Sequence, residues 1–522
     1  MSEPRIWTGG RVFTGRRYVE ALLVEDGKVA AVGPDAAVRG SAPAGAEVVP
    51  LAGRLVIPGL VDAHLHLGAL ARFRSGLDLS EVRGLENLVQ TLREWAGAHP
   101  AGPIVGHGLD VERGFDGRWP VREELDRAVG DRPVVLYHIS GHAAVANGAA
   151  LARAGVDSRP ESELRGRVGR TAEGRPNGVL YEEALRWLES RAEPSPGPDA
   201  LHRTLEFLAS QGLTTVASMT VFPDELAALR SLANEDRLPL RVRGYLPLLR
   251  VREFPSADLA PVGPPGRFAV VGTKGFADGA FGPRTAWLSE PYADDPGQCG
   301  LGVESDDALS SALEAGNALG LAPALHAIGD RGVVRALHLL APYARREGAP
   351  PRIEHVALTP PSVLAALDEV RPALVVQPGF VWSDWWLASR LGVERARWAY
   401  AFRTLADRGH LLAGSSDAPY DPVDPWRGLR SATLRRDEYG RSANPDPQEA
   451  LGVEEAFTLY GSHGGAALGD ATLGSLEVGS AADLVVLEAR SLEMALRQGS
   501  GGVRETWVDG VRVYDSGGRE RS

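Results

Sequence analysis

The segment RLVIPGLVDAHLHLG, residues 54–68, is an apolar run that ends in two histidines separated by one leucine. Alternate side chains of a β-strand share a face, so His64 and His66 lie on one side and Leu65 on the other. Two imidazoles at the end of a buried strand can chelate a divalent metal ion. The alternative is a pair of hydrogen-bonded core histidines, and the rest of the chain must decide between the two.

Lysine is the second residue type that stands out, because only two of the 56 lysine and arginine residues are lysines, Lys28 and Lys274. Lys28 lies in the turn VEDGKVA, where any polar residue would serve. Lys274 ends the apolar segment FAVVGTK, where a buried charge is costly without a specific partner. A lysine amine, unlike a guanidinium, has a neutral form that can react with carbon dioxide. Carbamylation of Lys274 and a buried salt bridge both remain open.

Eight apolar segments end in polar or glycine-rich turns and are typical of buried strands. Segments with apolar residues three and four positions apart, which are typical of helices, separate most of them. This repetition predicts a (β/α)8 barrel, whose functional side chains lie at the carboxyl ends of the strands. The eight segments are RLVIPGLVDAHLH, GLTTVASMT, LRVRGYLPLL, FAVVGTKGFADG, LAPALHAIGD, PRIEHVAL, ALVVQPGF and HLLAGSSDAP.

Five of these strand ends carry a side chain that could bind a metal ion. They are His64 and His66 on the first strand, Lys274 on the fourth, His326 on the fifth, His355 on the sixth and Asp417 on the eighth. Each has a simpler explanation alone: His326 could cap a turn, and Asp417 could cap a helix. His355 could be a core histidine paired with Glu354. Because all five ends meet on one rim, we predict a shared metal site.

The composition limits the other possibilities. The 522 residues carry a net charge of -12, which disfavours binding to nucleic acid or to an anionic membrane surface. The chain has no apolar run long enough to span a membrane and does not start like a signal peptide, so we expect a cytoplasmic protein. The single cysteine, Cys299, excludes an internal disulfide and a cysteine-based zinc site. A homodimer is expected only because twofold association is common.

The two ends of the chain differ from its middle in the secondary structure that their sequence pattern predicts. Residues 1–56 and 471–522 are rich in short strand and turn signals, and they are expected to form one small β-sandwich beside a barrel of residues 57–470. Between the first two barrel strands, about residues 70–200 are too long for a simple loop and predict an ordered insertion over the barrel mouth. Three histidines of this insertion, His107, His138 and His142, are candidates for substrate contact, and ordinary packing is the alternative.

The strand-end motifs resemble those of a known family. PGLVDAHLHL, RIEHV, SSDAP and the closing GSLEVGSAADLVVL are similar to barrel and accessory-sheet motifs of the amidohydrolase superfamily. GHGLD, GRPNGVLYEEA and FADGAFGPRTAWLSEPY further resemble the amidohydrolase 3 branch of N-substituted formamide deformylase and YtcJ-like hydrolases. The likeness covers nearly the whole chain. It does not name a substrate, because this scaffold supports many reactions.

This resemblance implies a binuclear metal centre. His64, His66 and Asp417 would hold one divalent ion, and His326 and His355 a second. A carbamylated Lys274 would bridge the two ions. Nitrogen and oxygen ligands without thiolate favour zinc, with manganese, iron or nickel as alternatives.

The expected reaction is hydrolysis of a non-peptide C–N bond in a small amide, such as an N-substituted formamide, by a metal-activated hydroxide. Asp417 would transfer the proton to the leaving amine. Lys274, as the bridge between the two ions, would be the second catalytic residue.

Four residues are candidates for substrate binding. Trp382 and Trp385 belong to an aromatic-rich segment after the seventh strand, and either could pack within a helix or face the site. Arg284 could bind a carboxylate or form a structural ion pair. His142 matches a histidine position of the resembled family. Asp384 is a further candidate for a supporting role.

Two other functions stay open. A mononuclear deaminase acting on a nitrogen heterocycle would use the same histidines and Asp417 without the Lys274 bridge. A non-catalytic binding protein that kept the barrel would usually lack one or more ligands, and here all six positions are filled. One tightly bound ion per chain would favour the deaminase, and a metal-free protein with an intact fold would favour the binding protein.

Overall fold

The computed structural model describes residues 3–139, 143–164, 167–181, 184–185, 187–188, 195–264 and 266–517. The chain divides into two compact units, Met1–Leu67 with Leu201–Ser522, and Gly68–Ala200. Each unit has its own sheets and its own buried core.

An eight-stranded parallel sheet forms the centre of the larger unit, in the order β21-β20-β19-β18-β17-β16-β15-β8. The predicted (β/α)8 barrel is therefore confirmed, and each of the eight apolar segments contributes one strand. The strands are β8 (Leu60–Leu65), β15 (Leu213–Ser218), β16 (Arg241–Pro247), β17 (Phe268–Phe276), β18 (Ala322–Ala327), β19 (Arg352–His355), β20 (Ala373–Val376) and β21 (Leu412–Gly414).

Hydrogen bonds join the first and last strands just beyond the end of β21. The amide of Asp417 donates to the carbonyl of His64 at 2.8 Å, and the amide of His66 donates to the carbonyl of Ala418 at 2.8 Å. These bonds place the segment after β21 directly against the end of β8. The two ends of the sheet therefore meet where the candidate ligands lie.

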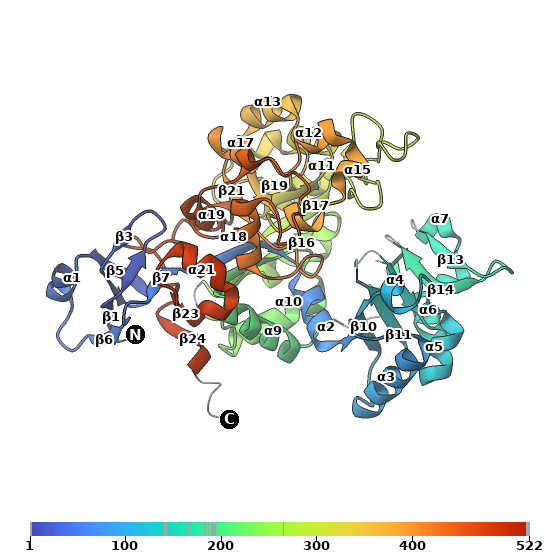
Figure 1. Cartoon of the computed structure of the whole chain (residues 1–522), viewed down its shortest axis with the longest axis horizontal. Helices are drawn as coiled ribbons and strands as arrows, with labels where there is room; N and C mark the ends of the chain where they lie inside the picture. The colour runs from blue at the N-terminus through green and yellow to red at the C-terminus, as the bar shows by residue number, and fades with distance from the viewer. Residues whose placement is uncertain are drawn as a thin grey trace. The chain divides into compact units, whose positions relative to one another are not determined.

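Helices follow the strands and surround the sheet, as Figure 1 shows for α11, α12, α13 and α17. Their apolar faces are buried, for example Val333, Ala336 and Leu340 of α12. The helices are α9 (Pro198–Ser210), α10 (Pro223–Asn234), α11 (Asp306–Ala318), α12 (Asp330–Leu340), α13 (Pro361–Val370), α14 (Phe380–Ser383), α15 (Leu387–Leu391), α16 (Val393–Ala396), α17 (Phe402–Asp407), α18 (Pro425–Leu434), α19 (Val453–Leu459) and α20 (Ser462–Ala467).

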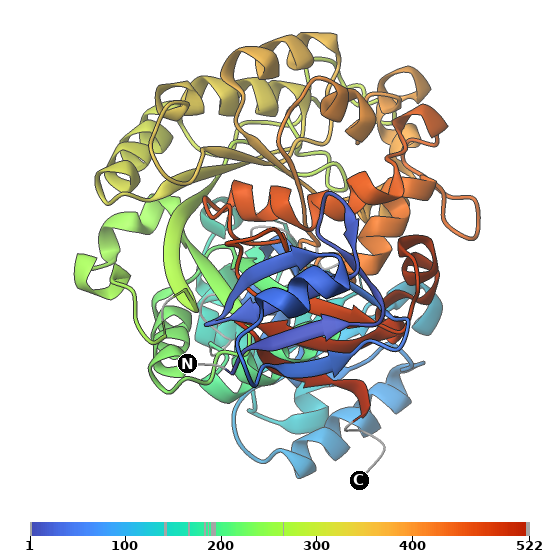
Figure 2. The same cartoon turned by 90° about the vertical axis from the view of Figure 1, so that its left-hand side faces the viewer.

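Both chain ends build a pair of small sheets in the same unit. One sheet has the order β5-β4-β1-β6, and the other joins the two ends in the order β24-β23-β22-β7-β2-β3. Figure 2 shows the N-terminal strands in blue beside the C-terminal strands in red. The strands are β1 (Arg5–Thr8), β2 (Arg11–Phe13), β3 (Tyr18–Val19), β4 (Ala21–Glu25), β5 (Lys28–Gly33), β6 (Glu47–Pro50), β7 (Leu55–Pro58), β22 (Leu484–Leu487), β23 (Val503–Val508) and β24 (Val511–Asp515).

The two small sheets share one apolar core. Trp7 of the first sheet meets Trp507 of the second edge to face, with ring centroids 5.2 Å apart. Leu22 and Val56 belong to the same buried cluster. Helix α1 (Asp35–Ser41) follows β5, and α21 (Leu492–Gln498) follows β22.

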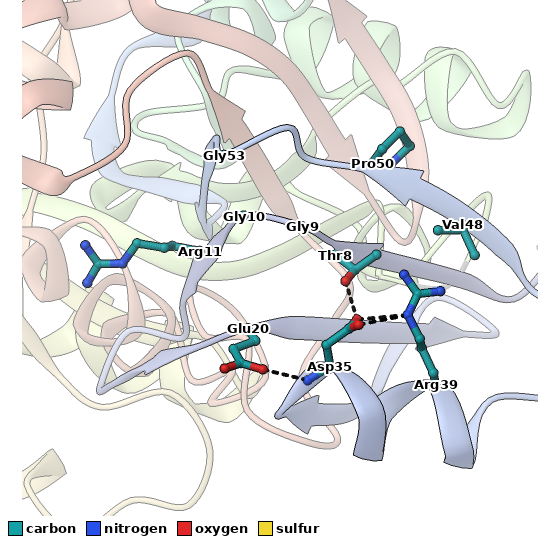
Figure 3. Close-up of a pocket in the computed structure, with 10 residues that line it drawn as sticks. All are labelled: Thr8, Gly9, Gly10, Arg11, Glu20, Asp35, Arg39, Val48, Pro50 and Gly53. Atoms are coloured by element: carbon teal, nitrogen blue, oxygen red, sulfur yellow. Dashed lines mark hydrogen bonds and ion pairs between the residues drawn. The ribbon is translucent and has the colours of Figure 1, made fainter.

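An open hollow of about 580 Å³ is lined by residues of the N-terminal segment, among them Thr8, Asp35 and Arg39, and none of the six candidate ligands lines it (Figure 3). Its acidic side chains are already paired. Asp35 accepts hydrogen bonds from Thr8 and Arg39, and Glu20 accepts one from the amide of Asp35 at 3.0 Å. Both acidic side chains of this hollow are therefore engaged within the folded chain.

The smaller unit, Gly68–Ala200, contains one mixed sheet in the order β13-β14-β12-β11-β10-β9. Its strands are β9 (Leu77–Asp78), β10 (Ile104–Leu109), β11 (Val134–His138), β12 (Ala143–Ala146), β13 (Val168–Arg170) and β14 (Pro176–Tyr181). Its helices are α2 (Leu67–Ser75), α3 (Leu85–Ala98), α4 (Val111–Gly114), α5 (Arg122–Val129), α6 (Gly148–Ala154) and α7 (Glu161–Leu164). That this unit covers the barrel mouth stays a prediction.

Within the described residues, every helix is too short or too polar to cross a lipid bilayer.

Candidate metal centre

Three buried side chains meet at the carboxyl end of the barrel. One potential ligand atom from each of His64, His355 and Asp417 lies within 4.8 Å of the other two. The Nε2 atom of His64 is 3.1 Å from Oδ1 of Asp417, and the Nε2 atom of His66 is 3.4 Å from the same oxygen. The structure therefore brings together four of the six predicted ligands around one carboxylate.

Unusual backbone angles direct two of these side chains. Strand alternation would point His355 away from the side that Glu354 faces, but His355 has a left-handed φ of 76°. Asp417 has a left-handed φ of 60°. Such angles cost free energy in residues other than glycine and cluster at functional sites. Here they turn an imidazole and a carboxylate toward the end of β8.

Two buried atoms of this cluster, Nε2 of His64 and Oδ1 of Asp417, contact each other at 3.1 Å and have no further hydrogen-bond partner within the described residues. Burying an unpaired polar atom is costly, and such atoms are uncommon in native proteins. Imidazole nitrogen and carboxylate oxygen are ligands that divalent metal ions prefer. The donor set and its two unsatisfied atoms therefore fit a divalent metal ion.

The second nitrogen of each of these histidines is held by another residue. Nδ1 of His64 is 2.5 Å from Glu354, and Nδ1 of His355 is 2.7 Å from Oε1 of Gln377. Nδ1 of His66 is 3.2 Å from the hydroxyl of Thr220. Since Nδ1 is occupied in all three, each ring presents Nε2 to the site.

His326 lies beside these three histidines, but its Nε2, rather than its Nδ1, is held by another residue. Its ring centroid is 4.4 Å from that of His355. Its Nε2 lies 3.0 Å from the carbonyl of Gly279, to which it can only donate. The nitrogen that remains for a metal ion is therefore Nδ1.

Lys274 lies in the same buried region, with only 2% of its surface exposed. Its Nζ is 4.3 Å from the ring centroid of Phe276, two residues along β17. The ring of Phe276 also contacts His326, with centroids 5.2 Å apart. The position of Lys274 thus agrees with the strand-end prediction, and its carbamylation stays a prediction.

Apart from His64, the titration of the cluster favours neutral imidazoles, and it favours an ionised Asp417 carboxylate. Burial lowers the pKa of His66 to about 4 and that of His355 to about 3, although Asp417 raises both. Burial, His355 and the Lys274 ammonium lower the pKa of His326. Burial opposes the charge of Asp417, but His64 and His66 hold its pKa well below the ordinary value. Neutral imidazole and carboxylate are the forms that bind metal.

His64 differs from the other histidines in its titration. Burial and the Lys274 ammonium lower its pKa, but the carboxylates of Asp417 and Glu354 outweigh them and raise it above the ordinary value. Two carboxylates, those of Asp417 and Glu354, thus flank His64 and favour a positive charge there.

The residues predicted to contact substrate lie in different kinds of surroundings. Arg284 forms a bidentate ion pair with Asp294, at 3.1 and 2.9 Å, so the structural alternative for this residue is realised. Trp385 is 52% exposed. The ring of Trp382 packs 5.6 Å from the guanidinium of Arg427. His142 lies outside the described residues.

Other polar residues named from the sequence have partners of their own. The carboxylate of Asp384 accepts a hydrogen bond from the hydroxyl of Tyr400 at 2.5 Å. In the smaller unit, His107 stacks on Phe73 with centroids 3.8 Å apart, and Nε2 of His138 is 3.0 Å from Glu112.

Several residues that support the site were missed by the strand-end reasoning. Gln377 directly follows β20, and Thr220 lies two residues after β15, so a polar side chain at a strand end could have indicated both. Glu354 was considered only as a partner of His355, but its carboxylate contacts His64 instead. That alternative is wrong, because Glu354 faces across the barrel toward β8.

Comparison with known proteins agrees with this geometry. The model of the amidohydrolase family matches residues 47–514. The chain is 31% identical to the putative amidohydrolase YtcJ of Bacillus subtilis (strain 168), over 98% of this chain and 99% of that protein. It is 26% identical to the N-substituted formamide deformylase of Arthrobacter pascens, over 96% and 95% of the two chains.

A solved structure is also similar over most of its length. An uncharacterized metal-dependent hydrolase from Pyrococcus horikoshii OT3 matches with a TM-score of 0.81 and 30% identity, over 93% of this chain and 98% of that chain. The resemblance seen in the sequence motifs is therefore confirmed. This chain belongs to the amidohydrolase family, on its YtcJ-like branch, and is a metal-dependent hydrolase.

Proposed function

We propose that the protein hydrolyses a non-peptide C–N bond in a small amide-type substrate, such as an N-substituted formamide. The observation that carries this proposal is the pair of buried, unsatisfied ligand atoms, Nε2 of His64 and Oδ1 of Asp417, 3.1 Å apart at the barrel end. The likeness to the N-substituted formamide deformylase supports the choice of bond.

In this proposal the six strand-end residues would hold two divalent ions, with zinc as the expected metal. His64, His66 and Asp417 would hold one ion. His355 and His326 would hold the other, and Nδ1 is the nitrogen that His326 has available, because Gly279 occupies its Nε2. When bound, such ions polarise a substrate carbonyl and make a water molecule more acidic.

Asp417 moves the proton. Its carboxylate is ionised and lies beside His64 and His66, so it can accept a proton from the attacking water and donate it to the leaving amine. His66 and His355 have pKa values lowered to about 4 and about 3, so they do not compete for this proton near neutral pH.

A carbamylated Lys274 would join the two sets of ligands. Its neutral amine attacks the carbon of carbon dioxide, an N–C bond forms, and one proton leaves, so that the side chain becomes an anionic carbamate with two oxygens. This change replaces a cation by an anion among metal ligands and removes a strong repulsion. Lys274 is buried at 2% exposure, so a carbamate at this position would be shielded from water.

The first experiment combines metal analysis with a substrate panel. We expect two equivalents of zinc per chain and turnover of formamides, simple amides or carbamates. One tightly bound ion and turnover only of amino-substituted nitrogen heterocycles would instead support the mononuclear deaminase. A folded, metal-free protein without turnover would support a binding protein.

The second experiment tests the bridge. Bicarbonate should accelerate reconstitution of the metal-free protein with zinc, Lys274→Ala should lose activity, and acetate or propionate should partly restore it. Lys274→Arg should not respond to bicarbonate, because a guanidinium stays protonated. A crystal structure of the zinc-loaded protein with an unmodified Lys274 ammonium paired to a carboxylate would contradict the bridge.

A further inference from the structure

A chain of buried polar residues lies behind His64 and crosses the barrel. Nδ1 of His64 is 2.5 Å from Oε2 of Glu354, and Arg352 donates to both oxygens of Glu354 at 2.6 and 2.9 Å. Arg352 also donates to the hydroxyl of Tyr245 at 2.9 Å and to the carbonyl of Ala63 at 2.6 Å. All four side chains, those of His64, Glu354, Arg352 and Tyr245, are fully buried.

Strand geometry explains how this row of hydrogen-bonded residues forms. Arg352 and Glu354 are two positions apart on β19, so their side chains share a face. The contact of Glu354 with His64 on β8 shows that this face is the barrel interior. The contact of Arg352 with the carbonyl of Ala63 ties the same pair to the backbone of β8, one residue before His64.

Stability alone does not account for this arrangement. Removing two charges from water costs several kcal/mol per ion, and well-packed apolar residues often stabilise a fold as well as a buried ion pair does. The pair does, however, give Glu354 a fixed position, and the two hydrogen bonds from the Arg352 guanidinium balance the charge of its carboxylate.

An ionised carboxylate can only accept hydrogen bonds, so Nδ1 of His64 must carry the proton of the neutral ring. The lone pair of that ring then lies on Nε2, which faces Oδ1 of Asp417. A carboxylate on the far nitrogen also increases the basicity of a metal-binding imidazole. Glu354 therefore acts on both the tautomer and the strength of His64 as a ligand.

The other two histidines that present Nε2 have weaker partners. His355 contacts the neutral amide of Gln377, and His66 contacts the hydroxyl of Thr220. Of these three rings, His64 alone has a carboxylate behind it within the described part of the chain. The negative charge of Glu354 therefore acts on His64 and not on His66 or His355.

We propose that Glu354 is a positioning residue that fixes the Nε2 lone pair of His64 toward the metal and strengthens its binding, while Arg352 and Tyr245 hold Glu354 in place. The proposal rests on the proposed function only in taking His64 as a metal ligand.

Two double variants separate the acceptor from its charge. Arg352→Met with Glu354→Gln removes both charges but keeps an oxygen that can accept from Nδ1 of His64. Arg352→Met with Glu354→Leu removes the acceptor as well. Both replace the ion pair by neutral residues of similar volume, so neither leaves an unpaired buried charge.

The readout is the zinc affinity of the metal-free full-length protein, measured by competition with a chromophoric chelator. Loss of a residue that orients a metal ligand costs roughly 10- to 100-fold in metal affinity. We expect the Leu double variant near the upper end of this range and the Gln double variant near the lower end. The partial recovery with Gln identifies the hydrogen bond to His64 as the cause.

A matched control comes from another buried ion pair of the barrel, Arg241 with Asp483. Arg241→Met with Asp483→Asn removes a comparable pair at the amino end of β16, away from the carboxyl ends that carry the candidate ligands, and the zinc affinity of this variant should match that of the natural protein. Circular dichroism and thermal unfolding of each metal-free variant report whether the fold is retained.

Zinc affinities of both Glu354 double variants equal to that of the natural protein would overturn the inference and leave the proposed function intact. An equal loss in the Arg241 control would show a general effect of stability and would also overturn it. If the natural protein itself fails to bind zinc, the proposed function fails, and the role of Glu354 fails with it.

Discussion

Buried charged residues occur at both ends of the barrel strands, and the two groups differ in how completely they are paired. At the amino end, Arg241 donates to Asp483 at 2.8 and 3.1 Å and also contacts Asp509. Arg267 contacts Asp509 at 3.3 Å, and Arg243 contacts Asp470 at 3.5 Å. At the carboxyl end, the ligand atoms of His64 and Asp417 lie 3.1 Å apart and have no further hydrogen-bond partner among the residues that the structure describes.

This difference separates a structural role from a chemical one. The amino-end arginines join β16 and the start of β17 to acidic residues of the C-terminal region, so their interactions are complete within the folded chain. Nε2 of His64 and Oδ1 of Asp417, at the carboxyl end, need an additional group to satisfy their remaining hydrogen-bonding or ligand capacity. Changes at the amino end should therefore reduce stability, and changes at the carboxyl end should reduce turnover.

The largest expected effect is that of Asp417→Asn on turnover. The change keeps the shape of the side chain but removes the base, so kcat should fall by roughly two to four powers of ten, the usual contribution of general acid–base catalysis. Steady-state kinetics on the best substrate of the panel measures this effect. Near-normal turnover would remove Asp417 from the mechanism.

Arg241→Met should have the next largest effect, and on stability. The change leaves the buried carboxylate of Asp483 without its cation, and breaking a buried pair in this way costs about 3–5 kcal/mol of unfolding free energy. Urea unfolding followed by circular dichroism measures the loss. Turnover per folded molecule should stay close to that of the natural protein.

The comparison becomes sharper when both partners are removed. Arg241→Met combined with Asp483→Asn should recover much of the lost stability, because the buried Asp483 no longer carries a charge and Asp509 keeps its contact with Arg267. If the double variant is as unstable as the single one, packing rather than charge explains the effect of Arg241.

Arg284→Ala should have a smaller effect. Its ion pair with Asp294 is partly exposed, and such pairs contribute roughly 0–1 kcal/mol. We expect a small loss of unfolding free energy and an unchanged KM, because the guanidinium is already occupied by Asp294. A KM that rises tenfold or more, with little change in stability, would show that Arg284 binds substrate.

Trp385→Ala should have the smallest effect. The side chain is 52% exposed, and surface substitutions usually change stability by less than about 0.5 kcal/mol. Kinetics with substrates that carry small and large apolar substituents checks its role. A loss of activity restricted to the large substituents would show that Trp385 contacts the substrate.

The sequence by itself determined the architecture and the set of candidate ligands. Apolar strand segments with polar ends are local patterns, and the rule that functional groups lie at the carboxyl ends of barrel strands connects them. The positions of His64, His66, His355 and Asp417 around one point follow from that rule. The family motifs identified the same residues independently.

Only the tertiary structure decided how these residues are used. Glu354 contacts His64, which lies 290 positions away, and Gly279 occupies Nε2 of His326 from a different loop. The left-handed backbone of His355 breaks the strand alternation from which its direction would be predicted. Local pattern gives residue types and faces, but the nitrogen that each histidine offers depends on partners that become neighbours only when the barrel closes.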